Sequence, residues 1–325
     1  MIRFFGHNKA WLGVEAFLAL FFLFLASTWA NRSIDLEVGS LDGTLRFEDK
    51  SLDYRIYFPK TGGSYPVIVF SHGFGGSKES FSLLGRFWAS RGYVVIHPSH
   101  GDSMAKIGEG SRVGSVRGRL RTAISQPDNI SKRVGDITLI LDSLDYLNSS
   151  VVGLSGKINP KSVGLAGHSF GAYIAMLLGG VSVSISKEGG GNNLYDPRVK
   201  CLLLVSPQGT GQQGLTKESY KTLAVPTMFV TGTRDRGVGG QDVSWRKEPY
   251  GFAPLGDKYL LVIEGANHFS FGGGLRGESS QITKTLSFYS DLFWESYLKE
   301  SINDKRFLRT FAGQSVKEGA VLSYK

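Results

Sequence analysis

The sequence holds very little cysteine. Among its 325 residues there is one, Cys201, which excludes an intramolecular disulfide and a cysteine-based metal site. The hydrophobic core alone must therefore hold the fold. No stretch rich in proline or serine divides the chain as a linker would. The 43 glycines follow no three-residue period, which excludes a collagen-like chain and predicts many tight turns.

The composition is that of a globular protein. Hydrophobic residues make up 41% of the chain and charged residues 20%, which excludes a disordered or fibrous chain. The net charge is +9, but no helix-turn-helix, RNA-binding aromatic signature or zinc-ligand spacing accompanies the basic residues. We therefore interpret them as solvated residues of a loop-like stretch and predict no nucleic-acid partner. They are Arg112, Arg117, Arg119, Arg121, Lys132 and Arg133.

The first thirty residues have the order of a secretory signal. Arg3 and Lys9 precede an apolar run at residues 16–26, and small residues follow as far as Ala30. This order predicts a signal peptide at residues 1–30, cleaved after Ala30. The remaining residues 31–325 would form one domain that is secreted or periplasmic.

An N-terminal membrane anchor is the alternative for the same segment. Counted from Trp11 and with Glu15 tolerated, the apolar stretch approaches the roughly 20 residues that span a bilayer. No cysteine lies nearby, so a bacterial lipoprotein anchor is excluded.

Apolar, β-branched runs alternate with helical patterns along the rest of the chain. This alternation predicts an α/β fold with a mostly parallel central sheet of about eight strands and helices on both faces. The expected strands are residues 44–47, 54–58, 67–70, 94–97, 163–166, 201–205, 227–231 and 259–264, the first two forming an antiparallel edge. The expected helices are residues 77–91, 135–147, 171–178 and 281–300. Long aperiodic stretches at 99–132, 184–199 and 208–223 are candidate walls of a cleft.

The pentapeptide Gly167-His168-Ser169-Phe170-Gly171 follows an expected strand and opens an expected helix. In that setting the G-x-S-x-G pattern predicts a sharp turn that presents Ser169 as a nucleophile, with the glycines giving the turn its room. The following helix N-terminus places positive potential beside the hydroxyl.

A serine nucleophile needs a histidine base and an orienting carboxylate. His268 follows the last expected strand, in a polar, glycine-containing loop, and is the predicted base. Asp235 follows the strand at 227–231 and lies between Ser169 and His268, the chain order that this class of site uses. It is the predicted acid. Asp242 and Asp257 are alternatives farther from that strand end.

The glycine-rich stretch 71–76 follows the strand at 67–70 and can supply backbone donors to an oxyanion. We predict that the N–H groups of Phe74 and Phe170 form the oxyanion hole, and that His72 organises the loop. An apolar substrate-binding lining is predicted from Phe74, Phe170, Trp245 and Phe269.

These motifs resemble those of the α/β-hydrolase superfamily. Residues 66–76, 166–173 and 231–235 are similar to the predicted dienelactone hydrolases, the platelet-activating-factor acetylhydrolase-like esterases and the cutinase-like polyester hydrolases. The resemblance spans about residues 50–300 and implies a metal-independent serine esterase without a cofactor. It departs from dienelactone hydrolases in having Ser169 where they normally have cysteine. It departs from many secreted cutinase-like enzymes because one cysteine cannot form their C-terminal disulfide.

The sequence thus predicts a serine hydrolase that cleaves a small-molecule or lipid-like carboxylic ester through an acyl-enzyme. The same residues would serve an acyltransferase, a thioesterase or a peptidase. A catalytically silent hydrolase-fold binding protein is the alternative of another class. The sequence does not predict an oligomeric state.

Overall fold

A computed structural model describes residues 35–103, 126–183, 194–272, 280–312, 315–316 and 319–325. The chain divides into two units, residues 1–36 and 37–325. The predicted signal peptide or anchor at 1–30 lies outside the described residues, as do Arg112, Arg117, Arg119 and Arg121. No helix in the described part of the chain is both long enough and apolar enough to cross a bilayer.

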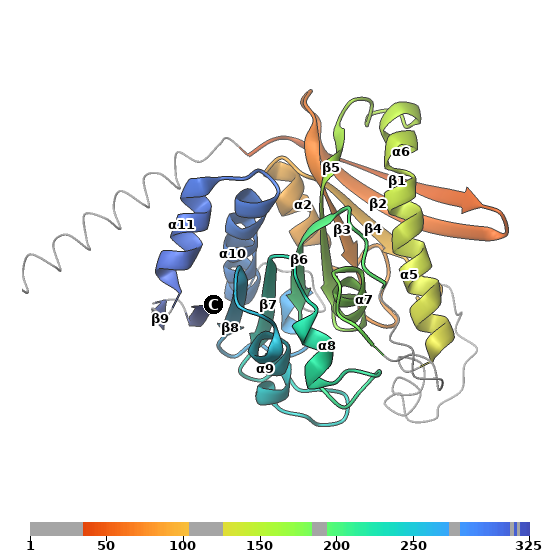
Figure 1. Cartoon of the computed structure of the whole chain (residues 1–325). Helices are drawn as coiled ribbons and strands as arrows, with labels where there is room; N and C mark the ends of the chain where they lie inside the picture. The colour runs from red at the N-terminus through yellow and green to blue at the C-terminus, as the bar shows by residue number, and fades with distance from the viewer. Residues whose placement is uncertain (1–34, 104–125, 184–193, 273–279, 313–314, 317–318) are drawn as a thin grey trace, which may run out of the picture. The chain divides into compact units, whose positions relative to one another are not determined.

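In the part of the chain that the structure describes, ten strands form one sheet, which Figure 1 shows with its helices. In chain order they are β1 (Val38–Phe47), β2 (Lys50–Pro59), β3 (Tyr65–Ser71), β4 (Val94–Ser99), β5 (Ile158–His168), β6 (Val199–Val205), β7 (Thr227–Gly232), β8 (Lys258–Ile263), β9 (Ser315–Val316) and β10 (Ala320–Tyr324). Their order in the sheet is β1-β2-β4-β3-β5-β6-β7-β8-β10-β9. Strands β4, β3, β5, β6, β7 and β8 are mutually parallel. The strands at both ends pair antiparallel.

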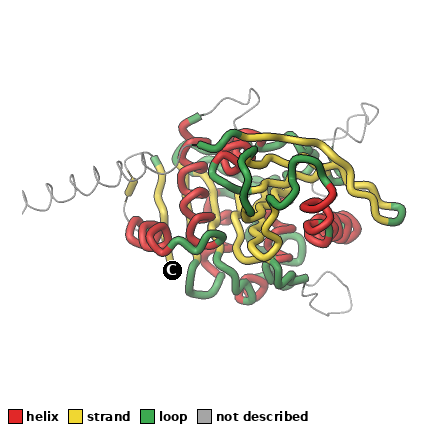
Figure 2. The backbone as a smooth tube through the Cα atoms, turned by 90° about the horizontal axis from the view of Figure 1, so that it is seen from above, coloured by secondary structure: helices red, strands yellow, loops and turns green. Residues whose placement is uncertain are grey.

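Helices cover both faces of the sheet, as the view in Figure 2 makes visible. On one face lie α2 (Ser82–Ser90) and α10 (Gln281–Tyr297), with α11 (Ile302–Phe311) packed on α10. The other face carries α5 (Pro127–Asp142), α6 (Leu144–Ser150), α7 (Phe170–Leu178), α8 (Lys217–Lys221) and α9 (Val243–Phe252). A short 3-10 helix, η1 (Ser270–Gly272), precedes α10.

Strand β3 shows why the sheet needs two covers. Its side chains alternate between the faces: Val67 and Val69 enter the hydrophobic cluster with α5 and α7, while Ile68 and Phe70 enter the cluster with α2 and α10. All four are buried. A strand that is apolar on both sides is stable only when both faces are covered, so the β-branched runs of the sequence fold as the centre of three layers.

The predicted α/β class, the parallel sheet and its antiparallel edge are confirmed. The sheet has more strands than the eight predicted, because the C-terminal residues add β10 and β9 beside β8. The expected helix at 77–91 begins only at Ser82, since Phe81 has a positive φ of 60°. The expected helix at 135–147 is two helices, and the first begins eight residues earlier, with Pro127 in its first turn, a position where proline is favoured.

The parallel strands bring four loops to one edge of the sheet. Strands β3, β5, β6, β7 and β8 all end there, and the loops after β3, β5, β7 and β8 carry Phe74, Ser169, Asp235 and His268. In sheets of this kind, sites form outside the carboxyl ends of the strands.

Candidate active site

Ser169 occupies a strained turn between β5 and α7. Its backbone has φ 53° and ψ −117°, a conformation that non-glycine residues seldom adopt. The turn is held from the neighbouring strand, because the Ser169 N–H donates to the Val205 carbonyl at 2.9 Å. A Cβ on Gly167 would stand 2.4 Å from the Gly171 backbone. Glycine is therefore required at position 167 by close backbone packing.

His268 reaches this serine from the loop after β8. Its Nε2 lies 3.1 Å from Ser169 Oγ, and its side chain is 16% exposed. The backbone of the loop is held by His168, whose Nε2–H donates to the His268 carbonyl at 2.9 Å. Burial lowers the pKa of His168 to about 3, so this imidazole is a neutral donor.

Asp235 orients the other side of the His268 ring. Its Oδ1 lies 3.0 Å from His268 Nδ1, and its Oδ2 accepts the Thr231 hydroxyl at 2.9 Å. The carboxylate is fully buried. With Nδ1–H donated to the carboxylate, Nε2 is the free acceptor for the Ser169 hydroxyl. The structure thus brings together all three residues that the sequence singles out.

Arg246 is a member of the site that the sequence analysis missed. The guanidinium lies in α9 with 2% of the side chain exposed, and its Nε stands 3.3 Å from Asp235 Oδ1. Its Nη1 donates to the carbonyls of Ser206 and Pro207, at 2.8 and 3.0 Å. Burial would raise the pKa of Asp235, but the His268 hydrogen bond and the Arg246 charge outweigh it and hold that pKa below its usual value. The carboxyl group therefore stays ionised.

The alternative acids lie elsewhere. Asp242 is exposed and caps α9, accepting the Ser244 N–H at 3.0 Å. Asp257 stands just before β8, at the opposite end of that strand, and pairs with Lys305 and Arg309 at 2.9 and 2.6 Å. The structure places neither against His268.

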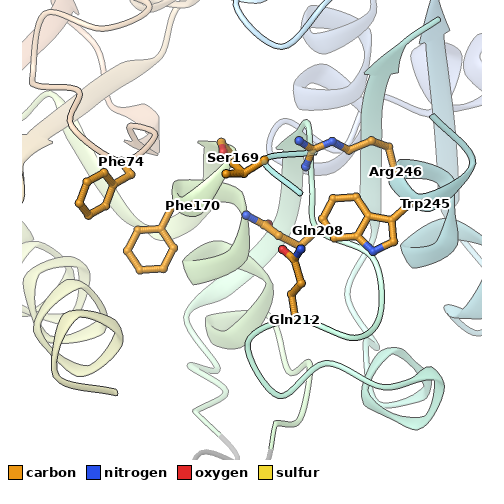
Figure 3. A pocket seen from close by; sticks show the side chains of 8 residues that line it. Phe74, Ser169, Phe170, Gln208, Gln212, Trp245 and Arg246 are labelled. Atoms are coloured by element: carbon orange, nitrogen blue, oxygen red, sulfur yellow. The ribbon is translucent and has the colours of Figure 1, made fainter. Parts of the chain in front are cut away.

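A pocket opens beside Ser169 (Figure 3). Aromatic rings and polar side chains both line it: Phe74, Phe170, Trp245, Gln208, Gln212, Val238 and Arg246. Trp245 is fixed by its indole N–H, which donates to the Thr210 carbonyl at 2.9 Å. Phe269, also predicted to bind substrate, is 79% exposed and outside this lining, with its ring edge-on to His268. The predicted cleft wall at 208–223 contributes Gln208 and Gln212 to the pocket.

Both residues of the predicted oxyanion hole line the pocket beside Ser169. Phe170 is the first residue of α7, so its N–H is one of the groups at the start of the helix that have no acceptor within the helix. Phe74 lines the same pocket from the loop after β3, and the two rings stand 6.3 Å apart. His72 hydrogen-bonds within this loop, with Nδ1 2.6 Å from the Gly73 carbonyl.

Comparisons with known proteins point to one family. The family model described as platelet-activating factor acetylhydrolase, isoform II, matches residues 26–112. Platelet-activating factor acetylhydrolase of Cavia porcellus is 22% identical over 236 residues, and that of Canis lupus familiaris 24% over 239. The chain has the α/β-hydrolase fold and is similar to the platelet-activating factor acetylhydrolases. This finding confirms the predicted resemblance to the platelet-activating-factor acetylhydrolase-like esterases.

The similarity to these acetylhydrolases is partial. Each alignment covers 65% of this chain and 49% of the relative, so the chain spans about half the length of the curated relatives it matches. The matched segment 26–112 contains the loop of Phe74 but not Ser169. Within the described residues, no group of three or more His, Cys, Asp and Glu side chains is placed to hold a metal ion.

Proposed function

We propose that this α/β-hydrolase cleaves carboxylic esters through an acyl-enzyme formed on Ser169. The observation that carries the proposal is the chain of hydrogen-bond distances from Ser169 Oγ through His268 to the buried Asp235. These three residues lie beside a pocket, at the edge of the sheet where such sites form. The similarity to acetylhydrolases supports the same reaction class.

In the acylation step, Ser169 Oγ attacks the ester carbonyl carbon while His268 Nε2 takes the hydroxyl proton. The carbonyl electron pair moves onto oxygen, and the N–H groups of Phe74 and Phe170 stabilise that oxyanion. When the intermediate collapses, the ester C–O bond breaks and His268 returns the proton to the leaving alkoxide. Asp235 stays ionised throughout and stabilises the imidazolium.

Deacylation repeats the sequence with water. His268 removes a proton from the water as its oxygen attacks the acyl carbon, and the second oxyanion occupies the same hole. The bond to Ser169 Oγ then breaks, and His268 protonates the serine. A carboxylic acid leaves, and the enzyme is restored without a metal or cofactor.

The pocket lining supports a proposal for the substrate class. Phe74, Phe170 and Trp245 offer apolar contacts. Gln208 and Gln212, which Figure 3 shows between Phe170 and Trp245, offer hydrogen-bonding groups. The matched relatives are named as acetylhydrolases. We propose a small or lipid-like ester with a short acyl group.

The predicted export or membrane anchoring by residues 1–30 remains part of this proposal.

Covalent labelling tests the proposal most directly. A fluorophosphonate probe should label the wild-type protein and the control Ser149→Ala, a variant of an exposed serine on α6, but not Ser169→Ala. Turnover of 4-nitrophenyl acetate should fall on the order of 10⁶-fold in kcat for Ser169→Ala. A series of acetyl, hexanoyl and dodecanoyl esters should show falling kcat/KM with length. Ester turnover that survives in Ser169→Ala refutes the mechanism.

A further inference from the structure

A buried polar cluster lies beneath the loop of Phe74 and has no part in the steps above. At its centre is Arg133 of α5, whose side chain is only 2% exposed. The sequence predicts that Arg133 is one of the solvated loop cations, and this prediction is wrong. A guanidinium withdrawn from water must be paired and hydrogen-bonded, so its partners indicate what it does.

Asp102 holds the guanidinium in one orientation. Arg133 Nε donates to Asp102 Oδ1 at 3.0 Å, and Nη2 donates to Oδ2 at 2.7 Å. This two-point pairing fixes the plane of the guanidinium as well as its position. The pKa of Asp102 is lowered because the Arg133 charge and hydrogen bonds outweigh burial, so the pair stays ionised.

The remaining donors of Arg133 hold two successive carbonyl groups of the loop. Nη1 donates to the His72 carbonyl at 2.5 Å, and Nη2 to the Gly73 carbonyl at 3.2 Å. His72 supports the second contact: its Nε2 accepts the His100 N–H at 3.1 Å, so Nδ1 carries the proton that Gly73 O receives. Burial is the main reason that the pKa of His72 lies well below its usual value, and the nearby Arg133 charge lowers it further. The low pKa favours this neutral form.

The peptide plane converts these contacts into a direction for a catalytic donor. In a planar trans peptide the C=O of one residue and the N–H of the next point in opposite directions. The Gly73 carbonyl and the Phe74 N–H belong to one such plane. The Gly73 carbonyl accepts from Arg133 and His72, and also from the Gly76 N–H at 3.1 Å. Because Arg133 and His72 hold this carbonyl toward α5, the Phe74 N–H is directed to the other side of the loop.

Arg133 also contacts the second proposed oxyanion residue. Its guanidinium carbon lies 4.7 Å from the centre of the Phe170 ring, in a cation–π arrangement. Behind the loop, Ser71 Oγ lies 2.9 Å from His100 Nε2, and His100 Nδ1 lies 2.9 Å from Asp136 Oδ2. This second Ser-His-Asp chain is buried, and Ser71 is not part of the pocket lining. It braces the start of the loop rather than offering a second nucleophile.

We propose that Arg133, oriented by Asp102, is a positioning residue that sets the Phe74 N–H for the oxyanion. This inference rests on the proposed function of the Ser169 site. Arg133 is not among the residues that line the pocket beside Ser169, so the role that we assign to it is one of positioning.

The test compares two buried arginine pairs. Arg133→Met keeps the length and apolar stem of the side chain but removes the donors to Gly73 and His72. The matched control is Arg91→Met, which removes a similarly buried pair with Asp291, 3.1 Å apart, between α2 and α10. Both variants lose an ion pair, but only the first loses the loop contacts. For Arg133→Met we expect kcat for 4-nitrophenyl acetate to fall about 10²- to 10³-fold, as for loss of one oxyanion donor. KM should stay unchanged, since the oxyanion exists only in the transition state.

A second variant and a second measurement keep the test decisive if Arg133→Met folds poorly. Asp102→Asn retains the shape of its side chain and both loop carbonyl contacts but loosens the guanidinium, so kcat should fall by a smaller factor. In protein with ¹⁵N-phenylalanine, the heteronuclear NOE of the Phe74 amide should drop in Arg133→Met and Asp102→Asn but not in Arg91→Met.

The two hypotheses fail in different ways. If wild-type protein shows no Ser169-dependent turnover, the proposed function fails, and the Phe74 amide still reports on the positioning role. If the Phe74 amide is unchanged in both loop variants, or if kcat falls no more in Arg133→Met than in Arg91→Met, the positioning role is overturned. A rise in KM with constant kcat also overturns it.

Discussion

A methyl group on the Cα atom of Gly171 would stand 1.9 Å from the carbonyl oxygen of Ser71. This contact joins the turn that holds Ser169 to the start of the loop that carries Phe74. Gly171 has no positive φ, so glycine is needed there for space and not for backbone freedom. The nucleophile and the proposed oxyanion loop are thus packed as one unit.

Gly171→Ala should therefore damage both activity and stability. The Cβ has only backbone atoms to displace, so we expect about 1–3 kcal/mol loss in the free energy of unfolding and a kcat/KM decrease of about 10²-fold from misplacement of the reacting groups. Urea unfolding and ester kinetics measure the two effects. The control is Gly251→Ala in α9, where no described heavy atom lies within 4 Å of the added Cβ. Gly251→Ala should retain activity; equal losses in both variants would contradict the packing argument.

Asp235→Asn tests the proposed acid. The amide introduced at position 235 can favour the His268 tautomer that carries its proton on Nε2. In that tautomer Nε2 cannot accept the Ser169 hydroxyl proton, so kcat should fall by up to about 10⁴-fold. The control Asp242→Asn removes an exposed carboxylate that caps α9, and asparagine is also a good cap. It should leave the kinetics unchanged. A double variant with His268→Ala should lose little more than His268→Ala alone, because the residues act as a unit. Near wild-type kcat in Asp235→Asn would remove this residue from the mechanism.

Acid should destabilise the fold well before the carboxylates titrate. Burial lowers the pKa of His97 to about 4, and Nδ1–H of its neutral ring donates to the Ser80 carbonyl at 3.1 Å. Between the unfolded value of about 6.5 and the folded value, only the unfolded chain binds the proton. The free energy of unfolding therefore falls with decreasing pH, by about 1.4 kcal/mol per pH unit for each such histidine. His168, with a folded pKa of about 3, acts in the same direction.

The variant His97→Gln isolates this contribution. Its unfolding free energy, measured in urea at pH 7.5 and pH 5.0, should depend less steeply on pH than that of the wild type. The difference should correspond to about 2 kcal/mol over this range. Identical pH dependence in the two proteins would show that His97 is not held neutral by the fold.

The N-terminal prediction needs a different measurement. When the chain is expressed with its native N-terminus, mass spectrometry of the mature protein should find a start at Asn31 or within a few residues of it. An intact Met1 recovered in the membrane fraction would favour the anchor instead. This result bears on residues 1–30 and leaves the chemistry at Ser169 untouched.

The parts of the site that depend on local sequence could be predicted best. The pattern around Ser169 could be interpreted because a strand, two glycines and a helix within a dozen residues define one turn. Asp235 and His268 could be selected because strand ends in a parallel sheet share an edge, which makes chain order a guide to position. The predicted start of helix α5, at residue 135, lies eight residues after its actual start at Pro127, because the sequence before residue 135 has no clear hydrophobic period.

Tertiary structure alone decided which charges lie inside. Arg246 and Arg133 have no local pattern that distinguishes them from solvated arginines; their partners Asp235 and Asp102 are eleven and 31 residues away. Likewise, Phe269 beside His268 and Trp245 in the pocket are equally aromatic in sequence, yet one is exposed and the other packed. The sequence by itself determined the three-layer fold and the nucleophile turn, because hydrophobic period and backbone sterics act over short spans. The order of the strands in the sheet determined the supporting ion pairs and the pocket lining, because those contacts exist only once distant segments have been brought together.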